Sequence, residues 1–356
     1  MPGNEIVTQD IEAAAGALEK EAKALEGRTV LISGGSGFLG SYMVATLLHL
    51  NRSVLRTPCR VIVLDNFITG ARENSIYDAR DPQVSLVECD VSKPLPEDFL
   101  ADYVIHAAGI ASPVYYRRFP LETIEVAVAG TKNLLAYAHS RKVLGFLYFS
   151  SSEIYGDPDP RYVPTPEDYW GNVSSIGPRS CYDESKRLGE TLCMTYHWFH
   201  GMPVRVVRPF NVYGPGMKKD DYRVIPTFLV SGMLKKPLPV HDKGNQTRTF
   251  CYVSDATAGF LKVLLAGKSG EVYNVGKDEE EINVVSLANL VAGLFPYPVS
   301  IQLTRYPDAY PAGEPKRRCP DLTKIRRELA YGPKINLETG LSRTLRWFQS
   351  VGTGTA

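Results

Sequence analysis

Tyr182 and Lys186 stand four residues apart in the stretch CYDESKR. If this stretch is helical, the spacing puts both side chains on one side of the helix. A lysine ammonium near a phenol favours the phenolate and lowers the tyrosine pKa toward neutrality. Such a tyrosine can take a proton from a substrate hydroxyl while hydride leaves the same carbon, so the pair indicates oxidation of an alcohol.

A second polar group, Ser150-Ser151-Ser152-Glu153, follows an apolar stretch earlier in the chain. Ser151 can hydrogen-bond the reacting hydroxyl, and Glu153 adds a carboxylate that simple alcohol oxidation does not need. A cap on a loop is the alternative role for Glu153. We therefore expect Ser151, Glu153, Tyr182 and Lys186 to form the catalytic group.

Three glycines, Gly34, Gly37 and Gly40, lie between an apolar stretch and a helical one, in SGGSGFLG. They form a GxxGxxG variant of the fingerprint that binds a dinucleotide pyrophosphate through a tight turn and a helix N-terminus. Asp65 ends the next apolar stretch, where a carboxylate hydrogen-bonds the ribose hydroxyls and repels a 2′-phosphate. The pattern predicts NAD as the cofactor, rather than NADP. A P-loop is excluded, since no GxxxxGK[ST] is present.

Residues at the ends of further apolar stretches would complete the cofactor site. Asp90 and Val91 are positioned to flank the adenine, and the small side chains of Ala107 and Ala108 would let a flat cofactor pass. The full set that we expect to bind NAD is Gly34, Gly37, Phe38, Leu39, Gly40, Asp65, Asn66, Asp90, Val91, Ala107, Ala108, Tyr182, Lys186 and Pro209.

An alternation of apolar, β-branched stretches with helical ones must position these residues. Strands are expected at 29–33, 60–64, 83–88, 103–106, 145–150 and 204–207. Helices are expected at 41–50, 121–139 and 180–200. The alternation predicts an α/β fold with a doubly wound parallel sheet of the Rossmann type. In such a sheet ligands bind at the carboxyl ends of the strands, which is where the polar groups above lie.

The pattern changes after Pro209, where glycine and proline become frequent and the helices shorten. We expect a smaller α+β lobe there, packed over the carboxyl edge of the sheet. Before the first strand, residues 5–26 are expected to form one amphipathic helix, with Ile11, Leu18 and Leu25 on one side. The expected domains are a helical extension (1–27), an NAD-binding domain (28–211, with part of 248–275 returning to it) and a mainly substrate-binding lobe (212–350).

Composition limits the possible partners and compartment. The 356 residues include 40 Lys+Arg against 39 Asp+Glu, so the near-zero net charge disfavours nucleic acid and anionic membranes as partners. The N-terminus lacks the basic start and apolar run of a signal peptide, and no apolar run is long enough to span a membrane. The six cysteines are scattered without a CxxC pair, which predicts free thiols in the cytoplasm and no metal site.

The chain resembles the extended short-chain dehydrogenase/reductase family that modifies nucleotide sugars, over about residues 28–350. The resemblance is carried by SGGSGFLG, the Tyr182/Lys186 pair and RPFNVYGPG at 208–216. Within that family, several segments are similar to the UDP-glucuronate decarboxylases. These segments are LDNFITG (64–70), SSSEIYGDP (150–158), EDYWGNVSSIGPRSCYDESKR (167–187), QTRTFCYVSD (246–255) and RRCPDL (317–322).

The resemblance implies a role for each matched residue. Ser151 matches the family's Ser/Thr, Tyr182 its base, Lys186 its ribose-binding lysine and Glu153 the acid/base carboxylate of the decarboxylases. The substrate-binding residues that it implies are Asn211 and Arg248 at the pyrophosphate, and Arg318 near the phosphates or the sugar carboxylate. Two long helices per subunit form a dimer interface in this family, so helices 121–139 and 180–200 imply a homodimer.

The implied reaction begins with oxidation of the sugar at C4, where Tyr182 removes the hydroxyl proton. In a glucuronate this creates a ketone β to the C6 carboxylate, and a β-keto acid loses CO₂ readily. Protonation at C5 and return of hydride to C4 complete the cycle. No net redox change occurs, so NAD can stay bound through turnover.

Two segments depart from the decarboxylase pattern and keep other reactions open. Gly216 stands where the decarboxylases usually have Arg. They also have an Asp two residues before a conserved Arg, with a Gly before that Asp, whereas here Asp221 is followed by Tyr222 and Arg223; the stretch 108–120 also differs. The 4,6-dehydratases also carry a Glu at the position of Glu153, whereas 4-epimerases commonly lack it. Dehydration or epimerisation of another nucleotide sugar thus remains an alternative. A non-catalytic relative that only senses cofactor is disfavoured, because the catalytic residues are all present.

Overall fold

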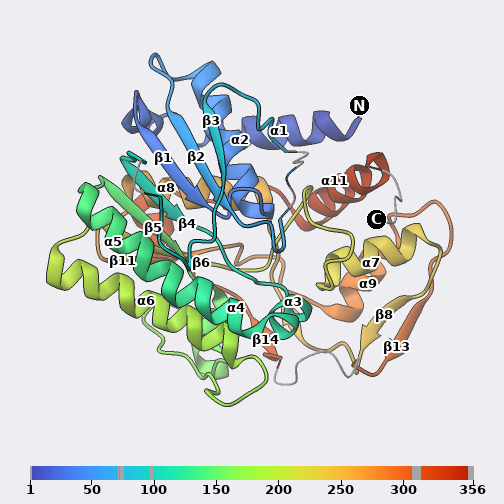
Figure 1. Ribbon diagram of the computed structural model, residues 1–356. Coiled ribbons are helices and arrows are strands. Elements are labelled where there is room, and N and C mark those ends of the chain that lie inside the picture. The colour runs from blue at the N-terminus through green and yellow to red at the C-terminus, as the bar shows by residue number, and fades with distance from the viewer. Residues whose placement is uncertain (1, 71, 73–75, 97–98, 307–313, 352–356) are drawn as a thin grey trace.

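A seven-stranded parallel sheet forms the centre of the molecule, with the strand order β11-β6-β5-β4-β1-β2-β3 (Figure 1). The computed structural model describes residues 2–70, 72, 76–96, 99–306 and 314–351. The strands of the sheet are β1 (Thr29–Ser33), β2 (Arg60–Asp65), β3 (Val84–Glu88), β4 (Tyr103–His106), β5 (Gly145–Phe149), β6 (Val204–Pro209) and β11 (Glu271–Val275).

The predicted doubly wound parallel sheet is confirmed, with one strand more than the sequence indicated. β11 comes from the C-terminal part of the chain and pairs in parallel with β6 at the edge of the sheet. The strand order reverses between β1 and β4, which lie side by side at the middle of the sheet. In open parallel sheets, ligands bind outside the carboxyl ends of the strands at such a reversal.

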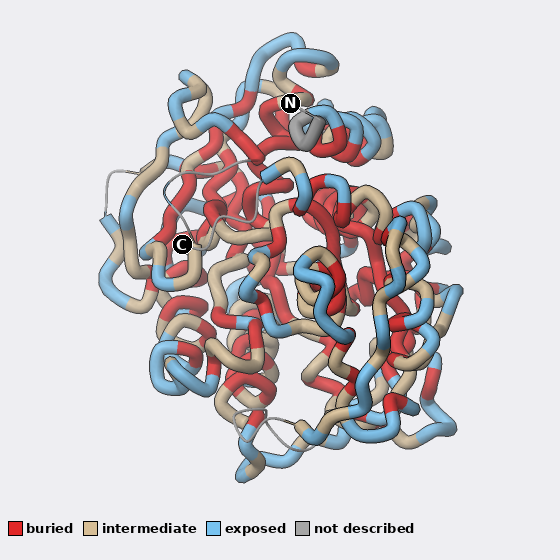
Figure 2. Tube along the Cα trace, turned by 90° about the vertical axis from the view of Figure 1, so that its right-hand side faces the viewer, coloured by how far each residue is buried: buried red, intermediate tan, exposed pale blue. Residues whose placement is uncertain are grey.

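Helices cover both sides of the sheet (Figure 1). On one side lie α5 (Thr131–Arg141) and α6 (Ser180–His200), and their apolar residues form a core with the strands. On the other side α2 (Phe38–Ser53) and α8 (Val253–Ala266) belong to a second, larger core. Figure 2 shows the buried residues concentrated in the strands and in the helix faces that contact them.

The single helix expected at 121–139 is instead three consecutive helical segments. They are α4 (Pro120–Glu125), a π-helical turn η2 (Val126–Gly130) and α5. A π turn inside a helix is rare and is found most often at functional sites. Here Val126 lines the larger cavity described below.

The expected helix at 5–26 is also divided. α1 (Pro2–Gly16) ends at a glycine, which is a poor helix former, and a 3₁₀ turn η1 (Ala22–Leu25) follows. Leu18 and Leu25 are fully buried, and α1 packs against α2, α8 and α11 (Leu337–Ser350). The first helix of the chain is therefore part of the larger core.

Asp10 is a fully buried carboxyl at the centre of this packing. It accepts hydrogen bonds from the Tyr252 hydroxyl at 2.7 Å, from Arg343 at 2.8 Å and from the Tyr42 hydroxyl at 3.5 Å. Burial raises its pKa to about 6, although the hydrogen bond from Tyr252 and the Arg343 charge lower it in part. Arg343 lies in α11, so this cluster joins the first and last helices.

The raised pKa of Asp10 predicts a pH dependence of stability. A carboxyl with a higher pKa in the folded state contributes stability at low pH that is lost as the pH rises through the folded pKa. Asp10→Asn removes this group from the titration. We compare the free energy of unfolding of the wild type with that of Asp10→Asn at each pH. The difference between them should fall by roughly 3 kcal/mol between pH 4 and pH 7, because each pKa unit is worth about 1.4 kcal/mol. Urea unfolding of both proteins at each pH measures this difference. A difference that does not change with pH would contradict the prediction.

The remaining elements form a C-terminal lobe with small sheets, and several short helices border the sites. β8 pairs with β13, β9 lies between β12 and β14, and β10 pairs with β7. Within the described ranges, every helix is too short or too polar to cross a bilayer. The bounds are α3 (Pro113–Arg118), η3 (Ser152–Tyr155), η4 (Pro160–Tyr162), β7 (Val212–Tyr213), α7 (Val224–Met233), β8 (Leu238–His241), β9 (Thr247–Arg248), β10 (Cys251–Tyr252), β12 (Ile282–Asn283), α9 (Val284–Ala292), β13 (Ile301–Thr304), β14 (Arg317–Arg318) and α10 (Thr323–Leu329).

Candidate active site

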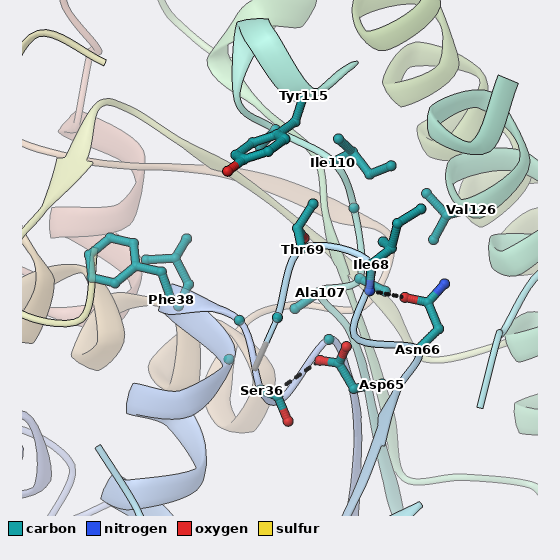
Figure 3. A pocket seen from close by; sticks show the side chains of 18 of the residues that line it. Ser36, Phe38, Asp65, Asn66, Ile68, Thr69, Ala107, Ile110, Tyr115 and Val126 are labelled. Carbon is teal, nitrogen blue, oxygen red and sulfur yellow. Dashed lines mark hydrogen bonds between the residues drawn. The ribbon is translucent and has the colours of Figure 1, made fainter. Parts of the chain in front are cut away.

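A cavity of about 390 Å³ opens at the carboxyl ends of β1, β2 and β4 (Figure 3). Its lining includes most of the residues expected at the cofactor, brought together from four segments of the chain. These are Gly34, Gly37, Phe38, Leu39, Gly40, Asp65, Asn66, Asp90, Val91, Ala107 and Ala108. The other three, Tyr182, Lys186 and Pro209, line a neighbouring cavity of about 260 Å³.

Two glycines of this loop, Gly34 and Gly40, have no room for a side chain. Gly34 has φ +74°, and a Cβ there would stand 2.7 Å from the backbone of Ala108. A Cβ on Gly40 would stand 2.1 Å from the carbonyl oxygen of Gly34. Gly37 is the N-cap of α2, so the N-terminus of that helix is at the cavity. This cradle fits the pyrophosphate of a dinucleotide, which needs close backbone approach and a helix N-terminus.

Asp65, at the end of β2, is hydrogen-bonded to the glycine loop, as Figure 3 shows. Its carboxylate accepts hydrogen bonds from the backbone N–H of Ser36 at 3.0 Å and from that of Phe67 at 2.9 Å. Burial raises the pKa of this carboxyl. A carboxylate has about four acceptor positions, so two N–H donors leave capacity for ribose hydroxyls.

The second cavity adjoins the first and holds the expected catalytic residues. Ser151, Glu153, Tyr182 and Lys186 all line it. Leu39, Ala107, Gly109, Phe149 and Arg223, among others, line both cavities and form the boundary between them. A molecule in each cavity would therefore meet the other near Tyr182.

Tyr182 and Lys186 are both buried and lie side by side on α6. The Tyr182 ring stacks on Tyr116 with a centroid distance of 5.4 Å and an interplanar angle of 11°. The Lys186 ammonium donates to the carbonyl of Phe149 at 2.7 Å and stands 5.9 Å from the Tyr182 ring centroid. The helix thus presents both groups to one cavity, as their spacing predicted.

The expected lowering of the Tyr182 pKa is not found. Burial raises the pKa of Tyr182 to about 12, and a Ser151 hydrogen bond offsets only part of that rise. Burial also lowers the pKa of Lys186 to about 8. The prediction was wrong because it counted the lysine charge and omitted the cost of burying a phenolate.

Glu153 is held between two arginines. Arg318 donates to both of its carboxylate oxygens at 2.7 Å, and Arg179 donates to Oε2 at 2.6 Å. Burial by itself would raise the pKa of Glu153, but the Arg318 and Arg179 charges outweigh it and lower the pKa to about 2. In this arrangement Glu153 is ionised at neutral pH, so it orients cations and holds no proton to give.

A second acid, Asp183, lies behind Arg179 at 3.8 Å from its Nε. Burial raises the pKa of Asp183 to about 7, and the nearby Glu153 charge adds to the rise. The cluster therefore contains two permanent cations, one anion and one carboxyl that is only partly ionised near neutrality. Its net charge favours an additional anion in this part of the cavity.

The remaining expected substrate residues also line the second cavity. Arg248 and Arg318 are register partners on the parallel strands β9 and β14. Arg248 donates to the carbonyl of Pro315 at 2.6 Å and to Glu314 at 3.1 Å. Asn211 has the left-handed backbone conformation (φ +42°) and donates to the carbonyl of Thr249 at 2.9 Å.

Several residues of the two cavities were not predicted. Tyr115, Lys218 and Arg223 line the first cavity, and Arg179 and His241 line the second. The basic cluster at 218–223 was a visible signal for Lys218 and Arg223, but nothing local in the sequence pointed to Arg179. Across the described ranges, no three His, Cys, Asp or Glu side chains gather in a way that could hold a metal ion.

Comparisons with known proteins agree with this geometry. Residues 30–276 match the family described as "NAD dependent epimerase/dehydratase family". The chain is 40% identical to UDP-glucuronic acid decarboxylase 5 of Arabidopsis thaliana over 313 residues, which cover 88% of this chain and 86% of that protein. It is 37% identical to UDP-glucuronic acid decarboxylase 1 of Danio rerio, with 90% of this chain and 72% of that protein covered.

Solved structures share the fold over almost the whole chain. Epimerase Mth375 of Methanothermobacter thermautotrophicus matches with a TM-score of 0.80 and 28% identity, covering 94% of this chain and 95% of that one. DesIV, a dTDP-glucose 4,6-dehydratase of Streptomyces venezuelae solved with NAD and TYD bound, matches with a TM-score of 0.79 and 28% identity, covering 90% and 97%. These neighbours carry out different reactions, so the fold does not select among them.

Proposed function

Because this chain belongs to the NAD dependent epimerase/dehydratase family, with NAD as its cofactor, we propose that it decarboxylates UDP-glucuronate to UDP-xylose. The reaction runs through a 4-keto sugar, and hydride leaves C4 and later returns to it. In this proposal residues 28–211, with part of 248–275, bind NAD, and residues 212–350 mainly bind the nucleotide sugar. The six free cysteines support a reducing, cytoplasmic location.

The observation that carries this proposal is the cluster of Arg179, Glu153 and Arg318 beside Tyr182. A glucuronate differs from the hexoses of dehydratases and epimerases in its C6 carboxylate. Arg179 and Arg318 both line this cavity and share the single carboxylate of Glu153, which makes this part of the cavity suitable for that added anion. Arg318 can also bind a planar carboxylate with two parallel hydrogen bonds, as it already binds Glu153.

Tyr182 acts as the base at the sugar 4-hydroxyl, and Ser151 orients that hydroxyl. NAD, when bound, supplies a positively charged ring that takes hydride from C4 and later returns it. Tyr182 holds its proton at neutral pH in the structure described, so added positive charge near the phenol is needed for its role. Lys186 lines the second cavity beside Tyr182, and Arg223 lines both cavities, so these two cations are placed to supply part of that charge.

Arg318 and Glu153 act after the ketone has formed. Loss of CO₂ leaves an enolate, and the electron pair of the broken C5–C6 bond moves toward the C4 oxygen. Arg318 holds the carboxylate until the bond breaks, and Glu153 fixes the position of Arg318. C5 then takes a proton, which must come from water because Glu153 is ionised beside the arginines that lower its pKa to about 2. Glu153 can pass that proton on only after it has moved away from the arginines and been protonated.

The test is a direct assay with purified protein. UDP-glucuronate and NAD should yield CO₂ and UDP-xylose in equal amounts, detected by trapping labelled CO₂ and by mass spectrometry of the nucleotide sugar. Parallel reactions with UDP-, GDP-, CDP- and dTDP-hexoses screen for a 4-keto-6-deoxy product or a C4 epimer. If no CO₂ is released but one of the hexoses is converted, the decarboxylase assignment is wrong. The family assignment would be unaffected by that result.

We further propose that the protein is a homodimer through the outer face of α4 and α6. Leu121, Ile124, Leu188, Trp198 and Phe199 are exposed large apolar residues on these two helices, with Leu121 at 70% and Phe199 at 77% exposure. The two helices contact each other and lie on the same side of the sheet (Figure 1). Exposed apolar area of this kind marks an interaction surface.

A charge placed on this face should separate the subunits. Leu188→Glu is expected to sediment as a monomer under conditions where the wild type sediments as a dimer, because a carboxylate at a packed interface loses its hydration. Leu303→Glu is the matched control, since Leu303 is also exposed but lies on β13 in the other lobe. A monomeric wild type at the highest concentrations tested would contradict the proposal.

A further inference from the structure

The two segments in which this chain departs from the decarboxylase pattern contact each other at the cofactor cavity. Tyr115 lies on α3, in the divergent stretch 108–120, and Asp220 lies in the divergent loop after β7. The Tyr115 hydroxyl donates to the Asp220 carboxylate at 3.0 Å, across 105 residues of sequence. Two segments that are distant in the sequence and that differ from the decarboxylase pattern thus share one contact.

The loop crosses the cavity from one wall to another. At its start, Gly216 has φ +91°, and a Cβ there would stand 3.2 Å from Ile76 and 3.4 Å from Phe38, both of which line the cavity. At its far end Asp220 meets Tyr115. The loop therefore contacts the cavity lining at two places, near Phe38 at Gly216 and at Tyr115 through Asp220; Figure 3 shows these two aromatic residues.

Further contacts fix the loop on either side of Asp220. The Arg223 guanidinium binds the Asp221 carboxylate through Nε at 3.0 Å and Nη2 at 2.5 Å, and the Arg223 backbone N–H donates to the same carboxylate at 3.1 Å. Lys218 stands 6.0 Å from the centroid of the Tyr115 ring. Gly216, Lys218, Asp221 and Arg223 all line the cavity, so the loop forms part of its wall.

We propose that residues 216–223, fastened to α3 by the Tyr115–Asp220 hydrogen bond, form a strap that retains NAD through the catalytic cycle. The strap joins the NAD-binding side of the molecule to the loop that leads into the C-terminal lobe. For the cofactor to leave on this side, α3 and the strap must separate. Tyr115 and Asp220 are thus positioning residues that act on the cofactor through the loop.

Retention matters for the reaction proposed above, on which this inference rests. The sugar is oxidised first and reduced last, by the same cofactor molecule. If the cofactor leaves between those steps, the enzyme releases a keto sugar and cannot finish the turnover. A contact that slows cofactor release without touching the sugar therefore protects product yield.

Cofactor exchange tests the strap without any sugar. Wild type, Tyr115→Phe, Asp220→Ala and the double variant are purified, loaded with isotopically labelled NAD and chased with unlabelled NAD. One hydrogen bond to an exposed carboxylate is worth on the order of 1 kcal/mol, so each single variant should release label about three- to tenfold faster. The double variant should be no faster than the singles, because both remove the same bond. Tyr162→Phe, at an exposed tyrosine on η4, is the control and should match the wild type.

The exchange result stands whether or not UDP-glucuronate is the substrate. Equal release rates in all the proteins would overturn the strap, and so would additive effects in the double variant. If the rates change as expected, a second measurement follows the keto sugar released per turnover with UDP-glucuronate. That fraction should rise in Tyr115→Phe and Asp220→Ala; an unchanged fraction with faster exchange would mean that release is too slow to compete with reduction, and would overturn the role in turnover.

Discussion

Tyr182→Phe should lower turnover by roughly 10²–10⁴-fold, the usual contribution of a general base, while the protein retains NAD. The substitution removes only the phenol oxygen. The ring keeps its stack on Tyr116, and Lys186 keeps its hydrogen bond to the Phe149 carbonyl. We therefore expect the loss to fall on the first chemical step and not on the fold.

Single-turnover absorbance of the reduced nicotinamide measures this step directly. In Tyr182→Phe the signal after mixing with substrate should rise slowly or not at all, while melting temperature and bound NAD stay near the wild-type values. Tyr196→Phe, a hydroxyl lost from the same helix α6, is the control and should leave the rate unchanged. Full activity in Tyr182→Phe would remove this residue from its proposed role.

Glu153→Gln should separate the two halves of the reaction. Gln has nearly the same shape but no charge, so Arg318 and Arg179 lose the partner that they share. Oxidation at C4 depends on Tyr182 and should survive, whereas the steps that follow should slow by about 10²–10³-fold, as when one preorganised electrostatic contact is lost. The expected observation is a burst of reduced nicotinamide without matching CO₂ release.

This variant needs a check on folding, since removing one partner of a buried ion pair can cost about 3–5 kcal/mol. Glu184→Gln is the matched control, because Glu184 pairs with Arg187 on the exposed side of α6. Arg318→Lys is the second probe: it keeps a positive charge but loses the two-pronged geometry. It should raise KM for the nucleotide sugar more than it lowers kcat. CO₂ release in step with oxidation in both variants would exclude the proposed role of the Glu153–Arg318 pair.

The cofactor half of the site could be predicted because its signals are local. Gly34, Gly37 and Gly40 fall within a single loop, and Asp65 ends the very next strand. Parallel pairing of β1 with β2 is enough to bring them together. Glycines shape this loop through their backbone alone. Its geometry could therefore be predicted without knowing which distant residues pack around it.

The arrangement around Glu153 could not be predicted in the same way. Arg318 is 165 residues from Glu153, and the sequence offers many arginines that could approach it. The choice of partner depends on how the C-terminal lobe packs against the sheet. The prediction of a lowered Tyr182 pKa was wrong for a related reason. The spacing of Tyr182 and Lys186 is visible in the sequence, but how deeply Tyr182 is buried depends on the whole fold.

The buried cluster at Asp10 has a consequence for how the chain is made. Asp10 leaves the ribosome well before its partner Arg343, which lies 333 residues later in the chain. Until α11 has been synthesised, α1 lacks both the cation for its buried carboxyl and one of the helices that cover it. Domains generally fold as units during synthesis. Here α1 cannot complete its packing until α11 has been made, so a nascent chain that has not yet reached α11 leaves the side of α1 that faces α11 uncovered.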